Sequence, residues 1–174
     1  MNCSQFEAFI YLHGCTCSND LALAMTLAHE LQHYVQRTKI KNLWATNMVA
    51  FLALRHMERS EFENLGLRTC AIPHEREARI IAKKIGEQLF GADAVGKHIE
   101  TKITERATEQ DASDWDCIRG LVASAPYDLA TETKRFFPKL KSCSWALHRV
   151  LRDVQPNDHD FEGVDLNELL EGRG

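Results

Sequence analysis

The chain has little of what marks DNA-binding, secreted or membrane proteins. Its 21 lysines and arginines are outnumbered by 25 acidic residues, and the net charge of −4 favours no nucleic-acid partner. No apolar run approaches the length of a membrane span, so no membrane association is expected. The first residues hold Glu7 and no basic cluster, which argues against a signal peptide. These absences predict a soluble protein that works in the cytoplasm.

Cysteine is present but carries no disulfide signature. The sequence holds six cysteines, and without a secretory signal we expect reduced thiols, most of them buried. Cys15 and Cys17 form a CxC pair that could serve a metal or redox site, and no matching pair occurs elsewhere. Because CxC alone is a weak signal, two ordinary thiols are the simpler interpretation.

What the chain does contain is helical periodicity, over a length sufficient for a true core. The segment 6–13 is the exception, since its β-branched and aromatic residues predict a strand. It would bind extended substrate as an edge strand, or be a buried strand or a first helical turn. We expect a mainly α fold, an α+β arrangement with a sheet reduced to about one to three strands. The expected helices cover 21–37, 43–59, 73–90, 94–110, 115–125, 127–137 and 140–154, with Pro138 ending the sixth.

The sharpest signal is an HExxH motif, His29-Glu30-Leu31-Gln32-His33, within the first expected helix. Histidines four residues apart lie on one face of a helix, close enough to bind the same ion. Glu30 projects about 100° round the helix from His29, beside the ion rather than onto it. Zinc-assisted hydrolysis needs two neutral imidazoles, a third ligand, a water in the open position and a carboxylate to accept its proton. The motif therefore predicts Zn²⁺ held by His29 and His33, with Glu30 as general base.

The flanks of the motif favour a helix in the core. Ser18, Asn19 and Asp20 are all suitable N-caps before a run rich in alanine and leucine. An apolar stripe at helical spacing is expected to make this helix central: Leu23, Leu27, Leu31, Tyr34 and Val35. The alternative is a chance match to HExxH, with histidines that are ordinary core or surface residues.

The third ligand is sought on the helix expected over 73–90. Glu75 shares one face of it with small residues that allow close approach of another helix: Ala78, Ala82 and Gly86. Glu75 is therefore preferred as the third ligand over Glu77, which is expected to point toward the side of Ile80, and over His74. The simpler alternative is that acidic residues at a helix N-terminus stabilise the helix dipole and need no metal.

With HELQH on one helix and E-x-E-A opening a later one, the chain resembles a zincin metallopeptidase of the gluzincin type. The pattern is similar to the ImmA/IrrE-type family of small intracellular zinc peptidases, which cut transcriptional repressors. The resemblance covers roughly 6–90 and implies a zincin-like helical core. It implies His29, His33 and Glu75 as zinc ligands and Glu30 as general base. Arg79 stands where such families usually place Asn or Asp, the residue that orients a ligand histidine.

We expect three parts: a zincin-like HExxH domain over 1–92, a helical extension packed on it over 93–156, and an acidic tail over 157–174. The expected function is zinc-dependent hydrolysis of a peptide bond in an intracellular protein or peptide. Tyr34, His74 and Tyr127 are candidates for stabilising the oxyanion. The alternative is a catalytically inactive zincin-like binding module that acts on a protein partner through the C-terminal helices or the tail.

Overall fold

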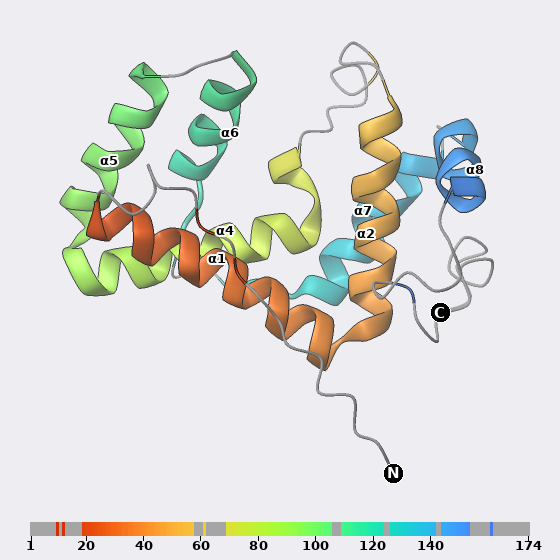
Figure 1. Ribbon diagram of the computed structural model, residues 1–174, viewed down its shortest axis with the longest axis horizontal. Helices are drawn as coiled ribbons and strands as arrows, with labels where there is room; N and C mark the ends of the chain where they lie inside the picture. The colour runs from red at the N-terminus through yellow and green to blue at the C-terminus, as the bar shows by residue number, and fades with distance from the viewer. Residues whose placement is uncertain are drawn as a thin grey trace.

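The computed structural model describes residues 10, 12, 19–57, 61, 69–105, 109–123, 126–141, 144–153 and 161. Within them lie seven α-helices, one short 3-10 helix and no strand (Figure 1). The elements are α1 Asp20–Lys39, α2 Lys41–His56, η2 Thr69–Ala71, α4 Pro73–Phe90, α5 Ala92–Thr104, α6 Glu109–Arg119, α7 Leu129–Lys141 and α8 Ser144–Asp153. The predicted mainly α class is confirmed. The expected strand, the CxC pair and the acidic tail fall outside the described residues, apart from Ile10, Leu12 and Phe161.

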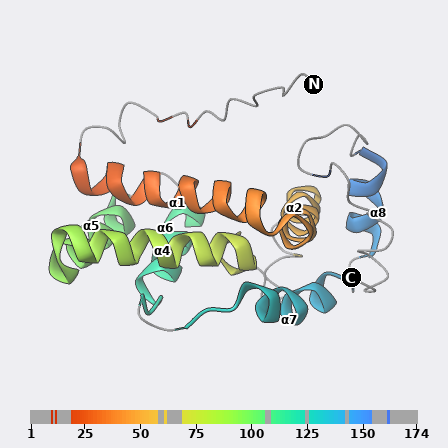
Figure 2. The same ribbon diagram turned by 90° about the horizontal axis from the view of Figure 1, so that it is seen from below.

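Helices α1 and α4 form the centre of the molecule and lie side by side (Figure 2). Helices α5 and α6 gather at one end of this pair, while α2, α7 and α8 gather at the other (Figure 1). Each end has its own apolar cluster, one uniting α2, α7 and α8 and the other uniting α1, α4, α5 and α6. Among the described residues, no helix has the length and apolar character needed to cross a membrane.

Small side chains let α4 approach α1 closely, as the sequence predicted. Ala78 and Ala82 are buried, and Gly86 lies directly against Met25 of α1. A Cβ added at Gly86 would stand 3.0 Å from Met25 Cγ and 3.1 Å from Val95 Cγ2. Even a methyl group at position 86 would press on both side chains, so the absence of a side chain suits the close approach of α4 to α1.

The apolar stripe predicted to bury α1 does not do so. Leu31, Tyr34 and Val35 are 51%, 51% and 44% exposed, whereas Leu21, Met25 and the polar Gln36 are buried. Leu23 and Met25 are two positions apart, which places them about 200° apart around the helix. The helix is central, as expected, but the choice of stripe was wrong, because the face that α1 turns toward α4 carries Met25 and the hydrogen-bonded Gln36.

Several helix boundaries also differ from the sequence prediction. Helix α7 continues through Pro138 to Lys141, although the proline was expected to end it. Pro138 removes the donor for the carbonyl of Lys134, and both residues are exposed, while Phe137 and Leu140 in the last turn are buried. Helix α5 ends at Thr104 rather than 110, and α6 spans Glu109–Arg119 rather than 115–125.

Candidate metal centre

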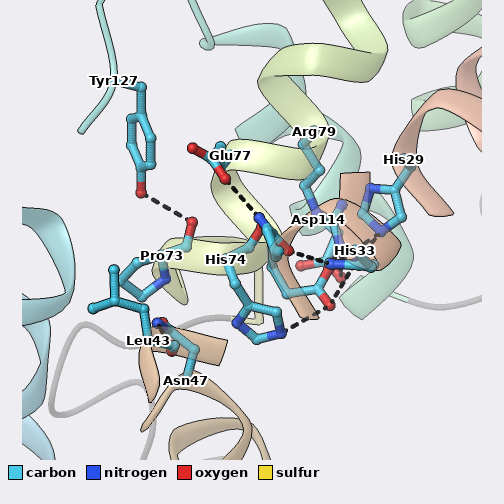
Figure 3. Close-up of polar contacts among 12 residues, drawn as sticks. His29, His33, Leu43, Asn47, Pro73, His74, Glu77, Arg79, Asp114 and Tyr127 are labelled. Carbon is cyan, nitrogen blue, oxygen red and sulfur yellow. Dashed lines mark hydrogen bonds and ion pairs between the residues drawn. The ribbon is translucent and has the colours of Figure 1, made fainter. Parts of the chain in front are cut away.

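The structure brings the three predicted ligands together from two helices. His29 Nε2 and His33 Nε2 are 3.0 Å apart on α1 (Figure 3). Glu75, in the first turn of α4, places Oε2 3.5 Å from His29 Nε2 and Oε1 3.4 Å from His33 Nε2. Within the described part of the chain, this is the only cluster of three or more such side chains whose ligand atoms could share one ion. The expected proximity of Glu75 to both imidazoles is confirmed.

The spacing of the two nitrogens suits a zinc ion. Zinc–nitrogen bonds of about 2.0–2.1 Å in a tetrahedral arrangement hold two nitrogens roughly 3.3 Å apart. The observed separation of 3.0 Å is close to that value. It is also the length of one N–H···N hydrogen bond, in which one imidazole donates to the other. Little movement of either ring is needed to exchange that proton for a cation.

The pKa shifts of His29 and Glu75 favour metal binding, whereas at His33 a cation must displace a proton. Burial and the neighbouring His33 lower the pKa of His29 to about 4, so this imidazole is neutral at pH 7. Burial of Glu75 opposes its ionisation, but the hydrogen bond from His33 and the nearby imidazoles lower its pKa to about 2. Burial acts to lower the pKa of His33, yet Glu75 outweighs it and the pKa is raised. A cation would take the place of the proton that His33 and Glu75 share.

A buried amide fixes the orientation of His33. Gln36 is 0% exposed, and its Oε1 lies 2.8 Å from His33 Nδ1. Its Nε2 donates to Glu77 Oε2 at 2.7 Å and to the carbonyl oxygen of His74 at 3.0 Å. Because Nε2 has both hydrogens engaged, Oε1 is the acceptor and His33 Nδ1 must carry a proton. The lone pair of neutral His33 is therefore on Nε2, directed toward His29 and Glu75.

Sequence reasoning missed this arrangement in two ways. It looked for the orienting residue at position 79, where the resemblance places Asn or Asp, but Gln36 takes that role. It also expected Glu77 to point toward Ile80, whereas Glu77 accepts from both Gln32, at 3.0 Å, and Gln36. The available signal was the spacing of Gln36, three residues after His33 on the same helix face.

His74 and Arg79 complete the surroundings of Glu75. His74 is 1% exposed, its Nε2 lies 3.6 Å from Glu75 Oε1, and its ring packs against those of His33 and Trp44. Burial lowers the pKa of His74 to about 3, so it stays neutral. An Arg79 NH2 nitrogen lies 3.8 Å from Glu75 Oε2 and 3.9 Å from Asp114 Oδ2. The Glu75 carboxylate is therefore held between imidazoles on one side and a guanidinium on the other.

A cavity opens beside His29, with a volume of about 290 Å³. Its polar side is formed by His29, Arg79 and Asp114, and its apolar side includes Met25, Trp115 and Ile118. Arg79 Nε is buried and has no hydrogen-bond partner among the residues that the structure describes. The cavity gives a small molecule or a side chain direct access to the imidazole of His29.

Glu30 and the three oxyanion candidates lie in different environments. Glu30 is half-buried on α1, and its charge helps to raise the pKa of His33. Of the three oxyanion candidates, Tyr34 is exposed, and the Tyr127 hydroxyl donates to the Pro73 carbonyl at 3.1 Å. Figure 3 places Tyr127 on the far side of α4 from His29. Only His74 is in contact with the cluster.

Comparison of the chain with protein-family models, curated proteins and solved structures gives no match. The resemblance to zinc peptidases therefore rests on the residues themselves, an HExxH helix and a glutamate from a second helix.

Proposed function

We propose that this chain is a zinc-dependent peptidase that hydrolyses a peptide bond in a cytoplasmic protein. His29, His33 and Glu75 hold the zinc ion, and Glu30 is the general base. The observation that carries the proposal is the convergence of two Nε2 atoms and one carboxylate within 3.0–3.5 Å of one another. Two imidazoles and a carboxylate are the protein ligands of a well-known class of catalytic zinc site.

Zinc would polarise the scissile carbonyl and make water acidic near neutral pH. The chain's own residues would transfer the proton and orient the ligands. Glu30 accepts the proton from the attacking water and delivers it to the leaving amine. Gln36 keeps the lone pair of His33 directed at the ion, and Arg79 holds one side of Glu75 in place. The cavity beside His29 receives a substrate side chain next to the scissile bond.

The experiment that tests the proposal separates metal binding from chemistry. Glu30→Gln removes the base but no ligand, so zinc content should stay unchanged while hydrolysis falls about 10²–10⁴-fold. The assay uses a mixed library of fluorescence-quenched peptides with wild-type protein, Glu30→Gln and the matched variant Glu87→Gln. Glu87 lies on α4, twelve residues beyond Glu75, and should be neutral. Equal hydrolysis by all three proteins would remove Glu30 from the mechanism.

A catalytically inactive binding module is the second candidate, and one observation favours it. Leu31, Tyr34 and Val35 are exposed apolar side chains on α1, on the face of the helix turned away from His29 and His33. In that case zinc, if bound, is structural and these side chains contact a protein partner. Wild-type protein that carries zinc but cuts no library peptide, with Glu30→Gln indistinguishable from it, would support this candidate over the peptidase.

A further inference from the structure

A second pair of reactive side chains lies outside the candidate metal centre, where η2 packs against α6. Cys70 of η2 is 1% exposed, and Cys117 of α6 is half-buried. The two thiols form a hydrogen bond with each other. They are 47 positions apart in sequence, so this contact exists only because the fold brings η2 and α6 together.

The surroundings make the two thiols unequal. The hydrogen bond from Cys70 lowers the pKa of Cys117 to about 7, and the guanidinium groups of Arg76 and Arg79 act in the same direction. The same hydrogen bond, together with burial, raises the pKa of Cys70. Asp114 faces both sulfurs and opposes ionisation of each. Cys117 is thus the accessible nucleophile, and Cys70 is the protonated thiol beside it.

We propose that Cys70 and Cys117 are a redox modification site that hydrogen peroxide converts reversibly into a disulfide. The Cys117 thiolate attacks one peroxide oxygen, an S–O bond forms as the O–O bond breaks, and hydroxide leaves. Cys70 then attacks the Cys117 sulfur, the S–S bond forms, and the hydroxyl departs with the Cys70 proton as water. The two sulfurs lose two electrons, and peroxide is reduced to one water and one hydroxide, which becomes the second water when it takes up the proton that Cys117 released on ionising. A low-pKa thiol that peroxide can reach, next to a second cysteine, is the arrangement found in peroxide-sensing proteins, and the half-buried Cys117 beside Cys70 resembles it.

The position of the pair gives the disulfide a structural consequence. Cys70 stands three residues before Pro73, where α4 begins, and Cys117 stands three residues after Asp114, which contacts Arg79. The cross-link therefore fastens α6 to the start of the helix that carries Glu75. It also fixes the wall of the cavity to which Asp114 and Ile118 belong. None of this depends on zinc or on the peptidase activity proposed above.

The test uses the 174-residue chain with the other four cysteines, Cys3, Cys15, Cys17 and Cys143, replaced by serine. Treatment with hydrogen peroxide should lower the intact mass by about 2 Da, and dithiothreitol should restore it. Peptide mapping should join the peptides that contain Cys70 and Cys117, in this variant and in wild-type protein. The wild-type map keeps the test decisive if the four-serine variant folds poorly by circular dichroism.

Two single variants assign the roles. With Cys70→Ser, Cys117 should stop at the sulfenic acid, which dimedone traps, and should react rapidly with iodoacetamide. With Cys117→Ser, the buried Cys70 should react with iodoacetamide at roughly one tenth of the rate of Cys117 or more slowly. Absence of the 2 Da loss, a cross-link between other cysteines only, or equal alkylation of the two thiols would overturn the proposal.

Discussion

From His29 onward, the two faces of α1 differ in the opposite sense from those of an ordinary amphipathic helix, whereas its first turns bury Leu21 and Met25. The face toward α4 contains His29, His33 and the fully buried Gln36, while the face toward solvent carries Leu31 and Tyr34, each 51% exposed. An ordinary amphipathic helix buries its apolar residues and exposes its polar ones. Burying polar groups is costly unless each one is hydrogen-bonded, and the inner face meets that condition through α4. The inner face is therefore organised for a site, and the outer face is left available for contact.

The largest predicted effect is a loss of zinc affinity on substitution of Gln36, which links α1 to α4 and orients His33. Gln36→Met keeps the size of the side chain but removes the acceptor for His33 Nδ1. Zinc affinity should fall about 10–100-fold, the usual effect of losing a partner of a ligand histidine. Competition with a chromophoric chelator measures it.

Gln32→Met is the matched control for Gln36. Gln32 donates to the same Glu77 carboxylate at 3.0 Å but has no hydrogen bond to a ligand. It should change zinc affinity less than about threefold, well below the effect of an orienting residue. An equal loss in both variants would mean that Glu77, rather than the tautomer of His33, governs affinity.

A smaller effect is expected from substitution of Gly86, the residue of α4 that lies against Met25 of α1. Gly86→Leu forces a side chain into Met25 and Val95, and overpacking of this kind costs about 1–3 kcal/mol in the free energy of unfolding. Urea denaturation measures the change. Gly96→Ala on α5 is the control, because nothing lies within 4 Å of its added Cβ. That variant should gain about 0.5–1 kcal/mol from helix propensity, and destabilisation of both by the same amount would contradict the close approach.

The smallest effect is expected on the outer face. Leu31→Ser and Tyr34→Ser remove apolar side chains that are about half exposed, so the free energy of unfolding should change by about 0.5 kcal/mol or less. Urea denaturation of these two variants and of Gly86→Leu under the same conditions puts the three changes in the free energy of unfolding on one scale. Losses above about 2 kcal/mol would show that this face is part of the core after all.

The site could be predicted from the sequence where its geometry is local. The spacing of His29 and His33 is a property of any helix, and the small residues after Glu75 indicated which glutamate would approach. The rotation of α1 could not be predicted, because it depends on Gln36 and Glu77 meeting across two helices. The apolar periodicity of α1 predicted the wrong buried face for the same reason. Continuation of α7 through Pro138 was missed because it depends on burial of Phe137 and Leu140 in a distant core.

The zinc content of purified protein tests the central claim most directly. Wild-type chain prepared without chelators and with zinc in the medium should carry about one Zn²⁺ per chain by elemental analysis. His33→Ala should carry almost none, and His148→Ala, which changes an exposed histidine of α8, should match wild type. Wild-type protein free of zinc, or a His33→Ala variant with an undiminished zinc content, would contradict the account.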